Sequence, residues 1–139
     1  MAFHHRRTVR FGDTDPAGIV FFARVFEYAH EAFEDCLAAG DLPLQVMLAQ
    51  ADWAMPLVHA EADYRAPMRL GEALEVEVAI AARSETSLTL AFTVRGAVDG
   101  KIRATVRHVH VAVDRASFAK RAVPAEVMVA FEGAGVAVG

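Results

Sequence analysis

The sequence contains a single cysteine, no long apolar run and no excess of positive charge. Because Cys36 stands alone, an internal disulfide and a cysteine-based zinc cluster are excluded. Charged residues interrupt every apolar segment before it reaches the roughly 18 residues that a membrane helix needs. The 14 Lys and Arg residues are outnumbered by 18 Asp and Glu residues, and this net charge of −4 argues against nucleic acid as the main partner.

What the sequence has in quantity is apolar residues. They make up 55% of the 139 residues, so the chain can bury a core, and we expect one domain over residues 1–139. Residues 132–139 consist largely of glycine, alanine and valine and are expected to form a flexible tail. Asp13 and Asp15 follow the basic start where a secretory signal would have an apolar stretch, so we expect no signal and a cytoplasmic location.

Alternation of apolar and polar residues predicts strands both early and late in the chain. A first strand is expected over residues 3–11, and later strands over 74–80, 88–94 and 101–113. The Asp99-Gly100 pair is a hairpin signal, so the later strands should be antiparallel. The expected count is about five strands.

Between these strands the apolar spacing changes to three and four residues, which indicates a helix. The pattern predicts one long helix from about Val20, with Gly40 as its C-terminal stop. Shorter helices are expected over residues 44–51 and 124–131. The fold class expected is therefore α+β, a curved antiparallel sheet packed on one long helix.

The loop of residues 12–18, Gly-Asp-Thr-Asp-Pro-Ala-Gly, precedes the predicted long helix and is the most informative stretch. A helix N-terminus presents unpaired backbone N–H groups and partial positive charge, which can polarise a carbonyl oxygen and stabilise an oxyanion. A carboxylate just upstream could attack that carbonyl or activate a water. From spacing alone, helix capping by Asp13 and Asp15 is the other interpretation.

The segment from Phe11 to Phe22 closely resembles the opening motif of hotdog-fold acyl-CoA thioesterases of the 4-hydroxybenzoyl-CoA thioesterase class. A second segment, from Ala62 to Glu72, is similar to that family's strand, its kink at Pro67 and its Gly-acid turn. The resemblance spans residues 5–130. It implies a five-stranded antiparallel sheet wrapped around one long central helix, and an enzyme that hydrolyses an aromatic or short acyl-CoA to free acid and CoA.

The resemblance assigns catalytic roles residue by residue. Asp15 falls at the position of the family's nucleophile or general base, and Asp13 is expected to order the loop. The backbone N–H of Phe22, placed at the start of the long helix, is expected to polarise the thioester carbonyl, and Gly18 to allow close approach. The family often has Tyr at the position of Phe22, but a backbone donor does not depend on the side chain.

Substrate-binding residues are expected along the same helix. Phe22, Phe26 and His30 recur every four residues and span about 12 Å, close to the reach of a thioester carbonyl plus a substituted ring. The resemblance places His30 where the hydroxybenzoyl enzyme has an acid that binds the substrate's phenol. The basic cluster that binds CoA phosphates in that enzyme is absent here, and Arg83 is the nearest cation. Further candidate cations are Arg65, Arg69, Arg103 and Arg107.

An isolated sheet of this kind leaves exposed edges, which proteins avoid leaving unpaired. The resemblance implies a homodimer joined edge to edge, pairing into a homotetramer, with the active site at the subunit interface. The expected partner is the acyl-CoA substrate. We expect no nucleic acid, membrane, metal or separate cofactor, because CoA is part of the substrate.

Other readings stay open at this point. The chain could be an acyl-carrier-protein thioesterase, a short-chain acyl-CoA thioesterase of the kind associated with the Tol–Pal envelope system, or a non-catalytic subunit that binds acyl-CoA. His108 and His110 lie two apart on a predicted strand and face the same side, where packing within the sheet is favoured over metal binding. Cys36 beside the apolar stripe is expected to pack in the core.

Overall fold

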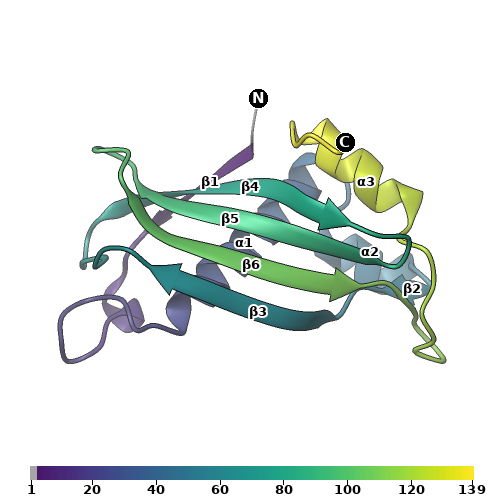
Figure 1. The fold of residues 1–139 in the computed structure, drawn as a ribbon, viewed down its shortest axis with the longest axis horizontal. Coiled ribbons are helices and arrows are strands. Elements are labelled where there is room, and N and C mark those ends of the chain that lie inside the picture. Colours follow the sequence, from purple (N-terminus) through teal and green to yellow (C-terminus); the bar gives the residue numbers. More distant parts are fainter. Residues whose placement is uncertain (1–2) are drawn as a thin grey trace.

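The computed structural model describes residues 3–139 (Figure 1). Residues 1 and 2, which the sequence analysis includes in the domain, lie outside the described residues. Five strands form one antiparallel sheet in the order β1-β4-β5-β6-β3. Their bounds are Phe3–Thr8 for β1, Leu57–Tyr64 for β3, Ala73–Arg83 for β4, Ser87–Gly96 for β5 and Ile102–Val111 for β6. The expected α+β class and five-stranded antiparallel sheet are confirmed.

The hairpin between β5 and β6 turns where the sequence predicts. Gly100 has a φ of +70°, a left-handed conformation that favours glycine. The side chain of Asp99 accepts a hydrogen bond from the Lys101 N–H at 2.9 Å, which fixes the turn from inside. The Asp99-Gly100 prediction is therefore confirmed.

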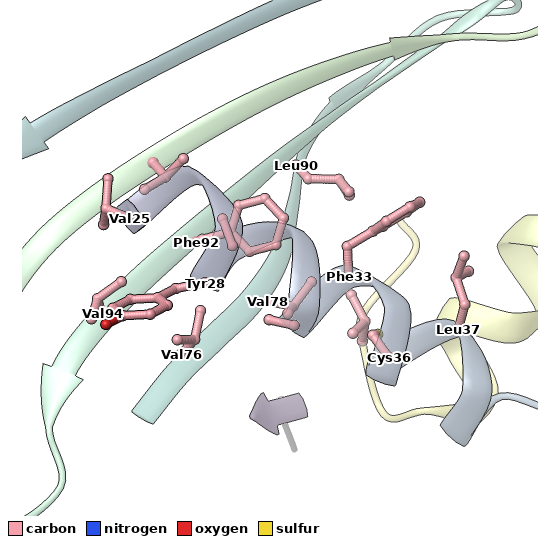
Figure 2. Close-up of a cluster of buried hydrophobic side chains, with 14 of the residues drawn as sticks. Val25, Tyr28, Phe33, Cys36, Leu37, Val76, Val78, Leu90, Phe92 and Val94 are labelled. Atoms are coloured by element: carbon pink, nitrogen blue, oxygen red, sulfur yellow. The ribbon is translucent and has the colours of Figure 1, made fainter. Parts of the chain in front are cut away.

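One helix, α1 (Arg24–Ala39), lies against a single face of the sheet (Figure 1). Its buried side recurs at three- and four-residue spacing, as in Ala29, Phe33 and Leu37. Figure 2 shows Val25, Tyr28 and Phe33 among side chains that come from the strands. The strands contribute alternate residues, among them Val76, Val78, Leu90, Phe92 and Val94. Each large apolar side chain buried in this way contributes about 1.5–3 kcal/mol to folding.

Cys36 also lies in this core and is fully buried. Burial raises the pKa of its thiol to about 12, so the thiol stays protonated and unreactive at neutral pH. The expected packing role of this residue is confirmed.

The predicted start of α1 at about Val20 is wrong, because Val20 pairs with Thr14 in a hairpin and the helix begins at Arg24. The end of α1 at Gly40 is confirmed. Glycine often ends a helix because it adopts the left-handed conformation, but that is not the reason here. Gly40 has a φ of −94°, but a Cβ atom there would lie 1.9 Å from the carbonyl oxygen of Ala130. Glycine is needed because α3 (Ala125–Gly133) packs directly against this end of α1.

Two short elements complete the fold. The helix α2 (Leu44–Gln50) matches the prediction for residues 44–51. A pair of two-residue strands, β2 (Trp53–Ala54) and β7 (Val113–Asp114), forms a second small sheet that the sequence analysis missed. Strands of two residues carry no alternation from which they could be predicted.

The end of the chain is partly packed. The helix α3 reaches Gly133, and Val136 is buried against the core with 3% of its surface exposed. The carbonyl oxygen of Val138 accepts a hydrogen bond from Arg83 at 3.2 Å. Because of these contacts, residues 132–136 are packed and not part of a flexible tail. Flexibility of residues 137–139 stays a prediction. Within residues 3–139, no helix combines the length and apolar character needed to cross a membrane.

Candidate active site

The segment after β1 forms a short hairpin with Asp15 near its tip. The predicted first strand ends at Thr8, and a 3-10 turn, η1 (Phe11–Asp13), leads into the hairpin. Thr14 bridges to Val20, and the Asp15 N–H donates to the Ile19 carbonyl at 3.0 Å. In Figure 1 this loop lies below the end of β3, at the opposite end of the sheet from α3.

Gly18 makes the return of this hairpin possible. Its φ of +81° lies in the left-handed region, where a side chain is strained. A Cβ atom at Gly18 would meet no other atom within 4 Å. The glycine is therefore required by the turn itself, and the space above it is open for a ligand to approach.

The carboxylate of Asp15 is held by one oxygen only. Its Oδ1 accepts a hydrogen bond from the Ala17 N–H at 2.8 Å, an Asx turn that fixes the side chain. Among residues 3–139, no donor reaches Oδ2. The capping interpretation is wrong, because the N-cap of α1 is Ala23 and no side chain caps it within the described chain.

Asp13, by contrast, is buried with 5% of its surface exposed. Its carboxylate accepts hydrogen bonds from the Arg7 guanidinium at 3.0 Å, the Arg10 N–H at 2.9 Å and the Tyr28 hydroxyl at 2.9 Å. Burial opposes ionisation, but these hydrogen bonds outweigh it and hold the pKa of Asp13 below its ordinary value. The network ties the loop to β1 and α1, so Asp13 orders the loop as the sequence analysis expects.

Phe22 lies just before α1 and not in its first turn, which corrects the predicted placement. No acceptor among the described residues 3–139 pairs with its backbone N–H. Its carbonyl oxygen accepts a hydrogen bond from the Tyr64 hydroxyl at 2.5 Å, which anchors this segment to β3. Across the hairpin, Asp13 pairs with Phe21, the residue before Phe22. Asp15 lies two residues beyond Asp13, and extended backbone separates the Cα atoms of Asp13 and Asp15 by about 7 Å.

Large apolar side chains are exposed around this hairpin. The exposed fractions are 81% for Phe11, 44% for Phe21, 61% for Phe22, 46% for Tyr64 and 55% for Leu70. An exposed apolar surface of this kind is typical of a binding site for a ligand or another protein.

A pocket of about 350 Å³ opens beside α1. Phe26 and His30 line it, as the four-residue stripe predicts, together with Leu57 of β3 and His108 of β6. His30 Nδ1 lies 3.3 Å from a carboxylate oxygen of Glu34, and its side chain is 41% exposed. Phe26 and His30 are thus brought together in one pocket, and their role with substrate stays a prediction.

His108 is the pocket residue that sequence reasoning did not place in the site. It is 1% exposed, stacks against Phe26 with ring centroids 6.3 Å apart and meets Phe92 edge-on at 5.1 Å. Burial, with smaller contributions from His110 and His30, lowers its pKa to about 4, so the imidazole is neutral at pH 7. The alternation of residues along β6 predicts that His108 faces inward, but it does not predict that His108 lines a pocket.

His110, two residues further on, also faces inward and is 2% exposed. Its Nδ1 lies 2.9 Å from the Met55 carbonyl oxygen, and its ring stacks on Phe33 at 4.8 Å. The packing expected for His110 is confirmed. In the part of the chain that the structure describes, no three His, Cys, Asp or Glu residues are grouped as metal ligands.

The cations are divided between the two ends of the sheet. Arg83 ends β4, about 33 Å along the strand from Ala73, which pairs with β1 at the hairpin end. Arg83 and Asp15 are therefore not brought together within one chain. Arg103 is bound to Glu72 and Asp99 at 2.8 and 2.9 Å.

At the hairpin end, Arg65 and Arg69 are both exposed. Arg69 forms a backbone bridge with Ile19 of the hairpin. Neither guanidinium makes a salt bridge with a carboxylate of residues 3–139. The Asp15 N–H donates to the carbonyl oxygen of the same Ile19, so Arg69 and Asp15 are joined through one residue of the hairpin.

Comparison with known proteins gives consistent matches. A model of the thioesterase-like superfamily matches residues 9–131. The chain is 34% identical over 128 residues to a 1,4-dihydroxy-2-naphthoyl-CoA hydrolase from Nostoc punctiforme, covering 92% of this chain and 85% of that protein. A hydrolase of the same name from Trichodesmium erythraeum is 45% identical over 78 residues, which is 56% of this chain and 56% of that protein.

Among solved structures, a 1,4-dihydroxy-2-naphthoyl-CoA thioesterase from Synechocystis has a TM-score of 0.88 and 30% identity to this chain. The match covers 94% of this chain and 96% of that chain. The segment matched by the family model contains the whole hairpin, α1 and the pocket residues.

Proposed function

The chain belongs to the thioesterase-like superfamily and is an acyl-CoA thioesterase, and from this premise we propose that Asp15 and the Phe22 N–H catalyse hydrolysis of an aromatic acyl-CoA. The family match confirms the resemblance stated from the sequence. The observation that carries the proposal is the hairpin, which fixes one oxygen of Asp15 and leaves the other without a donor among residues 3–139. The same segment leads into Phe22, whose backbone N–H is unpaired within the described residues.

Thioester hydrolysis requires a group that attacks the carbonyl carbon and a donor that stabilises the oxyanion. In our proposal, Oδ2 of Asp15 either adds to that carbon or takes a proton from the attacking water. The Phe22 N–H donates to the carbonyl oxygen as negative charge develops on it. When the carbonyl re-forms, the C–S bond breaks and CoA leaves as the thiolate, which is then protonated.

If Asp15 adds directly, the product of this step is a mixed anhydride between the acyl group and the Asp15 carboxylate. Water then attacks the anhydride, and the free acid leaves while the carboxylate is restored. Both routes consume one water and release one acid and one CoA thiol, so the overall balance does not depend on the choice.

An aromatic acyl group suits the pocket better than a long alkyl chain. Phe26 supplies an apolar wall, and His30 supplies a polar group one turn further along α1, about 6 Å from Phe26 along the helix axis. An alkyl tail would bury polar groups without a partner, which is costly. The relatives named for 1,4-dihydroxy-2-naphthoyl-CoA support a flat, hydroxylated acyl group as the substrate class.

The proposal also covers the fold family and the oligomeric state. We interpret α1 as the single central helix of a hotdog fold, because it contacts β1, β3, β4 and β6. Within residues 3–139, the edge strand β3 pairs on one side only, with β6, and seven of its eight residues are exposed. We propose that two copies join along β3, and that two such dimers form a tetramer.

A dimer also gives the distant Arg83 a role. Since Arg83 lies at the far end of β4, it reaches a CoA phosphate only in the site of another subunit. Arg65 and Arg69 lie at the hairpin end of the same subunit. The proposal therefore assigns CoA binding to Arg65 and Arg69 of one subunit and Arg83 of another.

The proposed function is tested by measuring release of the CoA thiol from a panel of thioesters. The panel contains 1,4-dihydroxy-2-naphthoyl-CoA, 4-hydroxybenzoyl-CoA, benzoyl-CoA, butyryl-CoA, palmitoyl-CoA and an acyl-carrier-protein thioester. We expect the aromatic thioesters to have the highest kcat/KM. Faster hydrolysis of palmitoyl-CoA or butyryl-CoA would contradict the substrate class, and no thiol release from any member would contradict catalysis itself.

A further inference from the structure

The floor of the pocket beside α1 contains a polar side chain whose hydrogen-bonding capacity is unused. His108 is 1% exposed, and within residues 3–139 neither of its ring nitrogens has a hydrogen-bond partner. A neutral imidazole carries one N–H donor and one acceptor nitrogen. Buried groups of this kind are nearly always paired in native proteins, so His108 points to a partner that comes from outside the chain.

The other polar residues that line the pocket are already paired. Glu27 binds Arg24 at 2.9 Å, and Glu34 lies 3.3 Å from His30. Glu31 accepts a hydrogen bond from Arg7, which also binds Asp13. The pocket therefore offers a ligand one buried polar group that is free, and that group is His108 in the part of the chain described here.

The neighbours of His108 are suited to a flat ring. Phe26 stacks on the imidazole at 6.3 Å, and Phe92 meets it edge-on at 5.1 Å. Phe26 lies in the first turn of α1, four residues after Phe22, which precedes the helix. An aromatic acyl group whose carbonyl lies at the Phe22 N–H would place its ring beside Phe26, with the edge of the ring toward His108.

We propose that the imidazole of His108 binds a hydroxyl group on the aromatic ring of the acyl group, and thereby sets a preference for hydroxylated over unsubstituted rings. This inference rests on the proposed function, because it places the acyl group in this pocket. The phenol O–H donates to the unprotonated ring nitrogen of His108, or the ring N–H donates to the phenol oxygen. The acidic mouth of the pocket, with its three paired glutamates, has no such free group.

The test compares kcat/KM for matched pairs of thioesters in the wild-type protein and in His108→Phe. The pairs are 4-hydroxybenzoyl-CoA with benzoyl-CoA, and 1,4-dihydroxy-2-naphthoyl-CoA with 2-naphthoyl-CoA. Phenylalanine keeps a flat ring against Phe26 and Phe92 but has no polar atom. Comparing the ratio within each pair cancels the intrinsic reactivity of the thioesters.

We expect the wild-type protein to prefer the hydroxylated member by about tenfold or more, because a site built to hydrogen-bond a hydroxyl rejects the analogue without it. His108→Phe should lose most of that preference while it still hydrolyses the unsubstituted ring. The matched control is His4→Phe, the same change on an exposed position of β1 outside the pocket, which should retain the preference. A preference retained in His108→Phe, or lost equally in His4→Phe, would overturn the inference.

A binding measurement on the wild-type protein separates this inference from the proposed function and does not depend on folding of the variant. The ¹⁵N resonances of the His108 ring are followed by NMR as 1,4-dihydroxy-2-naphthoic acid or 2-naphthoic acid is added. We expect a shift with the hydroxylated acid that the other acid does not cause. Equal response to both acids, or none, would contradict the role of His108, whereas absence of thioester hydrolysis would contradict the proposed function.

Discussion

Asp13 and Asp15 are two residues apart, yet the fold gives their carboxylates opposite surroundings. Asp13 is buried and fully engaged by Arg7, the Arg10 N–H and Tyr28. Asp15 is half-buried and has one oxygen open. The ionised Asp13 carboxylate therefore holds the loop in place. This leaves the Asp15 carboxylate positioned and available to react.

Replacement of Asp13 by Asn tests the ordering role. The change removes a buried charge that three donors stabilise, so we expect the free energy of unfolding at pH 7 to fall by roughly 2–3 kcal/mol. Because the folded-state pKa lies below the ordinary 3.8, the wild-type advantage is complete above that pH and disappears as the pH falls through the folded pKa. Urea unfolding at pH 7 and at several values below 4 measures both effects.

The matched control is Asp52→Asn; the Asp52 side chain is 84% exposed and forms an ion pair with Arg121. Surface ion pairs contribute little, so we expect a change within about 0.5 kcal/mol. Equal losses in the two variants, or a deficit of Asp13→Asn that persists unchanged at the lowest pH, would refute the proposed role of the network.

At the scale of secondary-structure elements, the close packing of α1 and α3 at Gly40 gives a sharp test. A Cβ atom at this position would lie 1.9 Å from the Ala130 carbonyl oxygen, so the helices must separate. We expect Gly40→Ala to lower the free energy of unfolding by about 2–3 kcal/mol. Gly12→Ala is the control, since a Cβ atom there meets nothing within 4 Å and its φ is not positive. Similar melting temperatures for both variants would contradict the close contact between α1 and α3 at Gly40.

The same elements show what could be predicted from the sequence. Alternation and helical spacing located the strands β4, β5 and β6 and the apolar side of α1, since these patterns extend over many residues. The same patterns predict a start of α1 at about Val20, whereas the helix begins at Arg24. The difference arises because the hairpin, in which Phe21 pairs with Asp13, continues the apolar spacing without being helical. Local pattern does not report such backbone pairing.

The candidate site was predictable to a similar extent. The motif resemblance marked Asp15, Gly18 and Phe22, and the helical stripe marked Phe26 and His30, all of which lie on one strand-to-helix segment. His108 is more than seventy residues away, and only the tertiary structure brings it beside Phe26. Arg83 could not be excluded from the same site by sequence, because its separation from Asp15 is set by the length and direction of β4.

At the scale of the whole molecule, the exposed edge strand predicts self-association. We expect the wild-type protein to elute with at least twice the 15.0 kDa mass of one chain, as measured by light scattering after size exclusion. Val58→Lys places a charge on β3 and should shift the protein toward the monomer and lower its turnover. Val98→Lys, at a position that is 97% exposed between β5 and β6, should change neither. A fully active wild-type monomer would contradict the assembly.

The most direct measurement of the central claim is the turnover of Asp15→Asn on 1,4-dihydroxy-2-naphthoyl-CoA or 4-hydroxybenzoyl-CoA, followed by thiol release. Asparagine keeps the Oδ1 that accepts from the Ala17 N–H, so the hairpin is preserved while the charge is lost. The account predicts a fall in kcat of about 10²–10⁴-fold with KM little changed, and no such fall in Asp52→Asn. Turnover of Asp15→Asn close to the wild-type value would contradict it.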